Sequence, residues 1–464
     1  MAMNILGNLL LLFLVFLVIP QNIFAHGIGQ SYTLPIPLTF YLGGSAAVVL
    51  ISFIIISLFI RPYQSEKSNG TKLLSKIPSF IGDFIRVLSI FLLLLVITTG
   101  LFGNQQPDRN FSPNFFWAFF VIFFVISSAL INGIWKIISP INLIVSAIEK
   151  IRHGGVNLNI NYPEKLNYWP AAVFYFIFIW FELISGLSSQ PRILSLLVIT
   201  YIVFQIWLVI IFGKKHLEKF EFLSVFANLL GNISVLEIEN MKIYFKNPLK
   251  KLNSNAVSNF SLVIFIILTL TGVAFDSFAE SPAFFSILRF LNLENLNFSL
   301  VRTLTLLLMI IPYLFLYTFF TYIGNKFSKD EKPFLFAAKI FSISLLPISV
   351  AYFVAHFFPL LLFQGQVLIA LISDPFGTGW NLYQTAGYKI NLKIMGVATI
   401  WYLQIGLIVI GHILAVLISH LLALNTYKNE KGAILSQYPI TLLMVIYTIF
   451  SLWLLSQPIV ISPS

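Results

Sequence analysis

The sequence contains no cysteine, and only 10% of its 464 residues are charged. The absence of cysteine excludes disulfide bonds, thiolate metal ligands and cysteine nucleophiles. Soluble globular domains typically carry about 25% charged residues, so the low charge and the 58% hydrophobic residues exclude that class. We therefore expect an integral membrane protein whose main partner is the lipid bilayer.

Several familiar chemical signatures are also absent. The chain has no G-x-S-x-G elbow, no H-E-x-x-H pair and no G-x-x-x-x-G-K-[ST] loop, so it lacks the usual serine hydrolase, zincin and P-loop motifs. The net charge of +11 could indicate nucleic-acid binding, but the basic residues lie in short loops between apolar stretches rather than on one continuous face. We expect no nucleic-acid partner.

The N-terminus resembles a targeting segment. Residues 4–24 are apolar and end at Ala25, after which His26 begins a polar, glycine-containing stretch. This pattern predicts a signal peptide over residues 1–25, cleaved after Ala25, with an uncleaved first helix as the alternative, since the segment lacks Lys and Arg at its start. After cleavage, the terminal amine and imidazole of His26 could chelate copper. The alternative is that His26 is simply the residue after the cleavage site.

The remainder, residues 26–464, is predicted to be all-α, a polytopic transmembrane helix bundle. Ten apolar segments are long enough to span a membrane, at about 38–60, 84–103, 114–135, 168–187, 193–213, 256–278, 299–325, 334–362, 395–425 and 438–458. With the mature N-terminus outside, 22 of the 28 basic residues fall on the inner side. The positive-inside rule therefore predicts a multi-pass protein of the inner (plasma) membrane with both mature termini outside.

Two segments on the predicted inner side are more than short connections. Residues 140–152 place isoleucines at helical spacing, which predicts an amphipathic helix on the membrane surface. Residues 214–255 form a cytoplasmic insert. Its composition favours a solvated basic loop, and the alternative is a short helix at 219–230 followed by a hairpin that pairs 235–239 with 242–245.

The stretch from Ala351 to Gly387 combines apolar residues with His356, Pro359, Gln366 and Asp374. Irregular backbone at membrane depth is tolerated only when it is buried in protein or lines a wet cavity. We therefore predict a helix break or re-entrant cap over a pocket in this stretch.

Ionisable side chains within membrane spans are costly and often functional. Counted along their spans, Glu182, Asp276 and His356 all lie near the outer boundary of the membrane, at the level of Asp374 and His26. His412 and His420 lie deeper and about 80° apart around one helix, so they do not form a close ligand pair. Hydrogen bonding within the core explains these two histidines.

The residues at the outer boundary could form one site. His356, Asp374 and His26 would be ligands of a divalent metal ion, zinc, copper or iron. Asp276 and Glu182 would be further ligands or general bases, and Gln366 would position substrate. The alternative for each residue is structural: a hydrogen bond between helices, contact with interfacial water, or an Asp-Pro turn.

Several stretches of the chain are distinctive: HGIGQSYTLPIPLTFYL from His26, LFGNQQPDRNFSP, YWPAAVFYFIFIWFELI, AFDSFAESP, the QGQ and SDPFGTGW motifs, and SQYPITLLMVIYTIFSLWLLSQP. Together they resemble one bacterial membrane family, usually labelled fenitrothion hydrolase. The resemblance covers nearly the whole mature chain and implies hydrolysis of organophosphate esters. Related sequences carry His-x-x-His in one helix, whereas this chain has Phe353 at the first of these positions and keeps only His356.

The leading functional hypothesis is a metal-assisted hydrolase of organophosphate-type esters at the outer face of the membrane, in which the cation would activate water and polarise a phosphoryl oxygen. The alternative is a permease or a metal (copper) handling protein in which the same polar groups line a path. His412, inward of His356, is the feature that favours a path.

Overall fold

The computed structural model describes residues 37–60, 71–152, 158, 160–248, 257–330 and 332–457. The predicted signal peptide at 1–25 and His26 lie outside these described residues. The rest of this section concerns the described part of the chain.

Nine apolar helical segments in the described residues are long enough to cross a membrane, and a tenth apolar helix is shorter. The nine are α2 (Leu38–Phe59), α3 (Ser79–Phe102), α4 to α5 (Phe111–Leu130), α9 (Pro191–Phe212), α12 (Phe260–Ala279), α14 (Phe298–Phe327), α15 to α17 (Phe334–Ser373), α18 (Val397–Thr426) and α19 (Glu430–Leu455). The shorter one is α8 (Trp169–Leu183). They coincide with the ten predicted spans, so the prediction of an all-α polytopic bundle is confirmed. The chain is an integral membrane protein.

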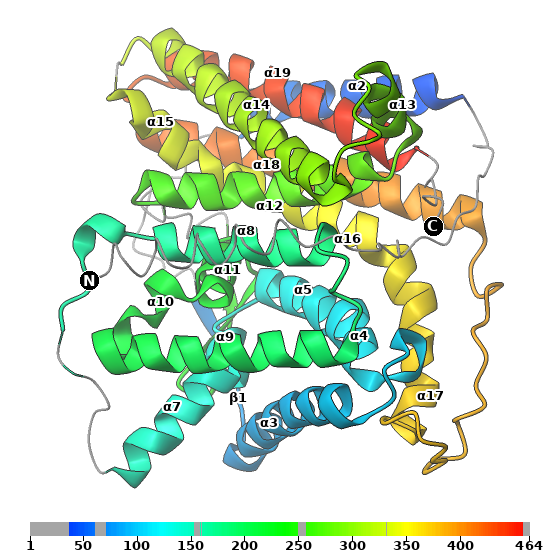
Figure 1. Ribbon diagram of the computed structural model, residues 1–464. Coiled ribbons are helices and arrows are strands. Elements are labelled where there is room, and N and C mark those ends of the chain that lie inside the picture. Colours follow the sequence, from blue (N-terminus) through cyan, green and yellow to red (C-terminus); the bar gives the residue numbers. More distant parts are fainter. Residues whose placement is uncertain are drawn as a thin grey trace.

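Helix α12 lies at the centre of the bundle, between α14 and α8, and also packs against α16 (Leu345–Phe363) (Figure 1). It is apolar on all sides, and nearly every residue from Ser261 to Phe275 is buried. A helix that is hydrophobic all round belongs inside a structure. By contrast, α3 lies at the edge of the bundle and exposes most of its apolar residues, as expected for a lipid-facing helix (Figure 1).

Of the two forms predicted for this stretch, the segment α15 to α17 contains a helix break, at Gln364–Gln366, and does not form a re-entrant cap. Helix α16 runs through Pro359 to Phe363, a 3-10 turn follows at Gln364–Gln366, and α17 (Val367–Ser373) then continues toward α4 (Figure 1). A proline inside a helix leaves the carbonyl four residues earlier without its N–H donor. Here that carbonyl, of Ala355, accepts a 2.8 Å hydrogen bond from Nε2 of Gln404 on α18. The neighbouring helix thus satisfies the group, and the helix continues past the proline.

A small sheet joins three segments that are far apart in the sequence. Its strands are β1 (Thr71–Lys76), β2 (Ile131–Asn132), β3 (Leu236–Glu239) and β4 (Lys242–Lys246), in the order β1-β4-β3-β2. The β3–β4 pair is the hairpin that was the alternative to a basic loop, and it turns through Asn240 and Met241 at φ of 49° and 58°. Two successive positive φ values are typical of the tight turns that suit twisted hairpins. The addition of β1 was not predicted.

Three helices complete this end of the bundle, which we call the sheet end. The amphipathic segment forms α7 (Pro140–Ile151), as predicted, with Ile141 and Val145 buried. The predicted short helix is split into α10 (Leu217–Phe220) and α11 (Phe222–Leu230). Helix α11 is almost entirely buried against α5 (Ile122–Leu130) and α8, so the insert packs into the bundle and is not a loop in solvent.

Candidate functional site at the Asp276–His356 pair

The site is built around a hydrogen-bonded Asp–His pair between two neighbouring helices at the end of the bundle opposite the sheet. Asp276 lies in the last turn of α12, and His356 lies in the second half of α16. Nε2 of His356 is 2.7 Å from Oδ2 of Asp276. The side chains are 19% and 14% exposed, respectively, so the pair is largely buried but not fully enclosed.

The second ring nitrogen of His356 is also engaged. Nδ1 lies 3.1 Å from Oγ of Ser277, and the hydroxyl of Tyr352 donates a 3.0 Å hydrogen bond to the same Oγ. When Ser277 donates its proton to Nδ1, the ring carries its own proton on Nε2 and donates it to Asp276. Tyr352, Ser277, His356 and Asp276 then form one chain of donors that point in the same direction. We call this chain the relay.

Helical spacing explains how these four residues meet. Tyr352 and His356 are four residues apart, so they share one face of α16. Asp276 and Ser277 are adjacent on α12 and project about 100° apart. The imidazole of His356 lies between them, which allows the carboxylate and the hydroxyl to bind opposite ring nitrogens.

A second carboxyl group follows the relay. Glu280 is four residues after Asp276, directly beyond the end of α12, and it interacts electrostatically with Asp276, Arg302 and His356. Burial, and then the nearby charge of Asp276, raise the pKa of Glu280 to about 7, while Arg302 and His356 oppose the increase. Glu280 therefore changes charge in the physiological pH range.

Arg302 on α14 supplies positive charge to the same region. Its side chain is buried, and its guanidinium lies 5.7 Å from the ring centre of Phe275 and 5.6 Å from that of Phe298. It interacts electrostatically with Glu280 and Asp276. Within the described chain its Nε has no hydrogen-bond partner. An unpaired donor of this kind leaves Arg302 with capacity to bind an additional oxygen.

Glu182 is the other predicted residue that the fold brings to this region. It lies near the end of α8, which packs against α12, and its carboxyl interacts electrostatically with Asp276. The predicted group at the outer boundary is therefore gathered in part. The fold brings together Asp276, Glu182 and His356. Four residues that the sequence did not single out lie beside them: Ser277, Glu280, Arg302 and Tyr352.

Asp374 lies elsewhere and is occupied by its own turn. Its Oδ1 accepts a 3.0 Å hydrogen bond from the backbone N–H of Thr378, and its Oδ2 accepts a 2.8 Å hydrogen bond from that of Gly379. The turn packs beside the start of α4, where Phe111 N–H binds the carbonyl of Pro375. This is the turn-forming role given above as the structural alternative for Asp374.

Gln366 anchors the loop that follows α17. Its Nε2 donates to the carbonyls of Leu362 and Asn391, and its Oε1 accepts from the hydroxyl of Tyr388 and the N–H of Asn391. These four bonds use the full capacity of an amide side chain. Its substrate-positioning role stays a prediction, which would require one of these bonds to break.

The predicted metal ligands are not assembled by the described residues. No group of three or more His, Asp or Glu side chains that could hold a metal ion occurs among them. His356 and Asp276 provide two donors, and His26, which would add another, lies outside the described part. The metal ion therefore stays a prediction.

The two deeper histidines are buried within the bundle. His420 on α18 binds Oε1 of Gln437 on α19 at 3.0 Å and the carbonyl of Ile60 at 3.1 Å, consistent with the predicted core role. His412 binds the carbonyl of Ile408 at 2.8 Å through Nδ1. Its Nε2 has no hydrogen-bond partner within the described residues.

Four members of the site were missed from the sequence: Ser277, Glu280, Arg302 and Tyr352. The four-residue spacings of Asp276 with Glu280, and of Tyr352 with His356, were the available signals, because such pairs share a helix face. Nothing in the sequence distinguished Ser277 from the other serines of the spans, since its role depends on a ring 79 residues away.

Comparisons with protein-family models, with curated proteins and with solved structures found no match to this chain. Its function is therefore argued from the geometry of the site.

Proposed function

We propose that this protein is a membrane-embedded hydrolase of small, uncharged organophosphate-type esters, in which Ser277 is the nucleophile and His356 its general base. The observation that carries the proposal is the position of His356 between Oγ of Ser277 at 3.1 Å and the carboxylate of Asp276 at 2.7 Å. A hydroxyl, an imidazole and a carboxylate in this order are the parts that nucleophilic ester hydrolysis requires.

The occupancy of both ring nitrogens decides which group His356 activates. Nε2 is bound to Asp276, so the base faces Ser277 through Nδ1. Serine proteases use the two nitrogens the other way round, with Nε2 toward the serine. The chemical roles are unchanged, because either nitrogen can accept a proton while the other is held by the carboxylate.

The reaction follows from these contacts. As Oγ of Ser277 bonds to the phosphorus atom, its proton passes to Nδ1 of His356, and Asp276 stabilises the resulting imidazolium. The bond from phosphorus to the leaving alcohol breaks, and that oxygen takes the proton from His356. A water molecule then attacks the phosphorus atom while His356 takes its proton. The bond from phosphorus to Oγ of Ser277 breaks, and Oγ recovers its proton from His356.

Arg302 would stabilise the negative charge that develops on the phosphoryl oxygen. Its unpaired Nε and its buried position favour this role, since a charge acts more strongly in a region that excludes water. Glu280 lies close enough to tune the charges of Arg302 and Asp276. An uncharged substrate suits this largely buried site, because it can reach the helices through the hydrocarbon of the membrane.

The proposal is tested by covalent labelling of the purified full-length protein in lipid nanodiscs. A fluorophosphonate probe should form a stable adduct on Ser277, detected by intact mass and peptide mapping, and a nitrophenyl phosphotriester should be hydrolysed. Ser277→Ala and His356→Ala should both abolish the adduct. An unlabelled Ser277 in folded protein, or labelling that persists in His356→Ala, would refute the proposal.

Ser286 provides a matched control. It lies on the exposed face of α13 (Pro282–Phe290), and its hydroxyl donates a 2.9 Å hydrogen bond to the carbonyl of Pro282. Oγ of Ser277 likewise lies 3.2 Å from the carbonyl four residues earlier, which competes with Nδ1 of His356 for the same proton. Among the described residues, no hydrogen bond joins Ser286 to a histidine. Ser286→Ala should therefore keep full labelling and full hydrolysis.

A proton-coupled permease is the second candidate, and a specific observation favours it. The buried Nε2 of His412 is unpartnered within the described residues, on a helix that packs along α16. A proton could pass from the relay toward His412 if the chain carries solutes. Uptake into proteoliposomes that is driven by a pH gradient and lost in His412→Ala, without ester hydrolysis, would favour this function over the hydrolase.

A further inference from the structure

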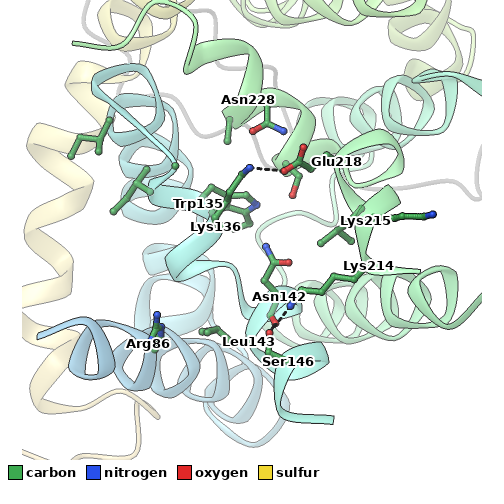
Figure 2. Close-up of a pocket in the computed structure, with 16 residues that line it drawn as sticks. Arg86, Trp135, Lys136, Asn142, Leu143, Ser146, Lys214, Lys215, Glu218 and Asn228 are labelled. Atoms are coloured by element: carbon green, nitrogen blue, oxygen red, sulfur yellow. Dashed lines mark hydrogen bonds and ion pairs between the residues drawn. The ribbon is translucent and has the colours of Figure 1, made fainter. Parts of the chain in front are cut away.

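A cavity of about 710 Å³ lies at the sheet end, far from the relay in the sequence. It is open to solvent on one side and is lined by α3, by α6 (Ile134–Ile138), by the first half of α7 and by the segment from Lys214 to Asn228 (Figure 2). Pockets for small molecules commonly have volumes of about 300–1,000 Å³. The cavity is therefore of the right size for a ligand.

The lining combines basic groups with apolar walls. Arg86, Lys136 and Lys214 contribute charge from three different elements, and Trp135 and Leu143 contribute apolar surface. Figure 2 shows the side-chain amide of Asn142 directed into the same space. Asn142 is in the first turn of α7, a helix of 12 residues whose N-terminal dipole also favours negative charge.

Each of the three basic residues has an acidic partner, but these pairs are open to solvent. Lys136 lies 2.7 Å from Glu218, Lys214 lies 3.7 Å from Glu149, and Arg86 lies 2.9 Å from Asp83. All six side chains are between 34% and 67% exposed. Exposed pairs of this kind are weak, so a phosphate group that accepts several hydrogen bonds can compete for the same cations.

We propose that this cavity binds a phosphate-bearing anion, with the head group of an anionic phospholipid as its source in the membrane. Lys214, Lys136 and Arg86 would bind the phosphate oxygens, and Asn142 would donate a further hydrogen bond. Beside Arg86, α3 exposes Phe84, Val87 and Phe91, which would hold the acyl chains. Basic pockets between helices are a common form of recognition for anionic lipids.

Native mass spectrometry of the full-length protein tests the proposal with phosphatidylglycerol as the probe and phosphatidylcholine as the uncharged comparison. Lys214→Gln should weaken phosphatidylglycerol binding by about fivefold, the effect of one lysine on an anionic head group. Lys214→Arg should restore it. Lys150→Gln is the matched control, since Lys150 is an exposed lysine in the last turn of α7 and does not line the cavity.

A second arm distinguishes a lipid from a soluble ligand. The midpoint of thermal unfolding is measured in inorganic phosphate and in chloride at the same ionic strength. In one outcome, phosphate raises the thermal midpoint of the wild type but not of Lys214→Gln, while phosphatidylglycerol is not selectively retained. This result supports the site and assigns it to a soluble anion. Equal effects of Lys214→Gln and Lys150→Gln, or no preference for either anion, would overturn the proposal. Folding of each variant is verified by its chromatographic profile.

Discussion

The hydroxyl of Ser349 on α16 donates a 2.8 Å hydrogen bond to Oγ1 of Thr269 on α12. Ser349 precedes His356 by seven residues, and Thr269 precedes Asp276 by the same number. Seven residues are close to two helical turns, so the same faces of two parallel helices meet at both levels. This buried contact fixes the depth and rotation of α16 relative to α12, and thereby places His356 opposite Asp276.

The relay should act as a unit in catalysis. Asp276→Asn should lower ester hydrolysis by about 10³- to 10⁴-fold, because the amide no longer holds the ring in the required tautomer. Adding His356→Ala should cost little more than the worse single change, since members of one catalytic unit are strongly non-additive. Hydrolysis rates per folded molecule, together with melting curves, test this expectation.

His420→Ala is the control for these substitutions. His420 is fully buried and bridges α18 to Gln437 and Ile60, so the change should lower stability by about 1–3 kcal/mol. The rate per folded molecule should not change. If instead Asp276→Asn and His356→Ala only lower stability, and do so additively, the relay has a packing role alone.

Glu280 should make stability depend on pH. Its pKa is about 7 in the folded protein against 4.5 as the ordinary value, so the folded state binds the proton more tightly than the unfolded state. The free energy of unfolding should therefore decrease as pH rises from about 4.5 to about 7, and level off above. Melting curves of wild type and Glu280→Gln across this range should diverge, because the amide does not titrate.

Glu294→Gln is the matched control for Glu280. Glu294 follows α13 and forms only a 3.9 Å exposed pair with Arg289. Its variant should reproduce the wild-type pH dependence. A Glu280→Gln protein that retains the full slope would show that another group causes it.

Glu221 should be critical for stability at the sheet end. Its fully buried carboxylate accepts hydrogen bonds from the N–H groups of Leu223 and Ser224, from the hydroxyl of Tyr201 and from Nε1 of Trp135. Burial raises the pKa of Glu221, while these bonds oppose the increase. Glu221→Ala should cost about 2–4 kcal/mol, since it removes a helix cap and leaves buried donors unpaired.

Glu218→Ala, three residues earlier, provides the comparison in the same denaturation experiment. Glu218 forms a half-exposed pair with Lys136, so its loss should cost at most about 1 kcal/mol. Equal costs for the two variants would contradict the structural role assigned to Glu221.

Chelation should distinguish a hydrolase that uses Ser277 as its nucleophile from one that uses a bound metal ion. The relay reaction uses only protein groups, so treatment with EDTA should leave hydrolysis unchanged. The metal site predicted from His26 and His356 would instead be supported if chelation abolishes hydrolysis. In that case, reconstitution should restore one bound metal ion and activity, and His26→Ala should lose the bound ion. Elemental analysis of the purified protein decides between these outcomes.

Reporter fusions should locate the sheet end. Pairing of β1 with β4 places the loops before α3 and before α12 at this end. The bonds of Asn325 to Tyr427, and of Asp330 to Lys428, bring together the loops after α14 and after α18. Reporters after Lys76, Lys329 and Lys431 should all be cytoplasmic, because most basic residues lie in these loops. An external signal after Lys76 or Lys431 would reject this orientation.

The sequence by itself determined the helices. Long apolar runs must become helices in a membrane, because only internal hydrogen bonds satisfy the backbone there, and all ten predicted runs form apolar helices. The helix at residues 140–151 also followed from local pattern. The hairpin at Asn240 and Met241 was the alternative to the solvated loop that the composition favoured. The burial of α11 did not follow from local pattern, because an apolar face does not reveal what it packs against.

The site depended on tertiary structure for a specific geometric reason. Depth along a helix follows from the rise per residue, so the common level of Asp276 and His356 could be calculated from the sequence. Rotation about the helix axis could not, because the packing of α12 against α16 sets it. That rotation turns Ser277 toward Nδ1 of His356. Asp374 does not join the site, because the backbone N–H groups of its own turn bind both of its carboxylate oxygens.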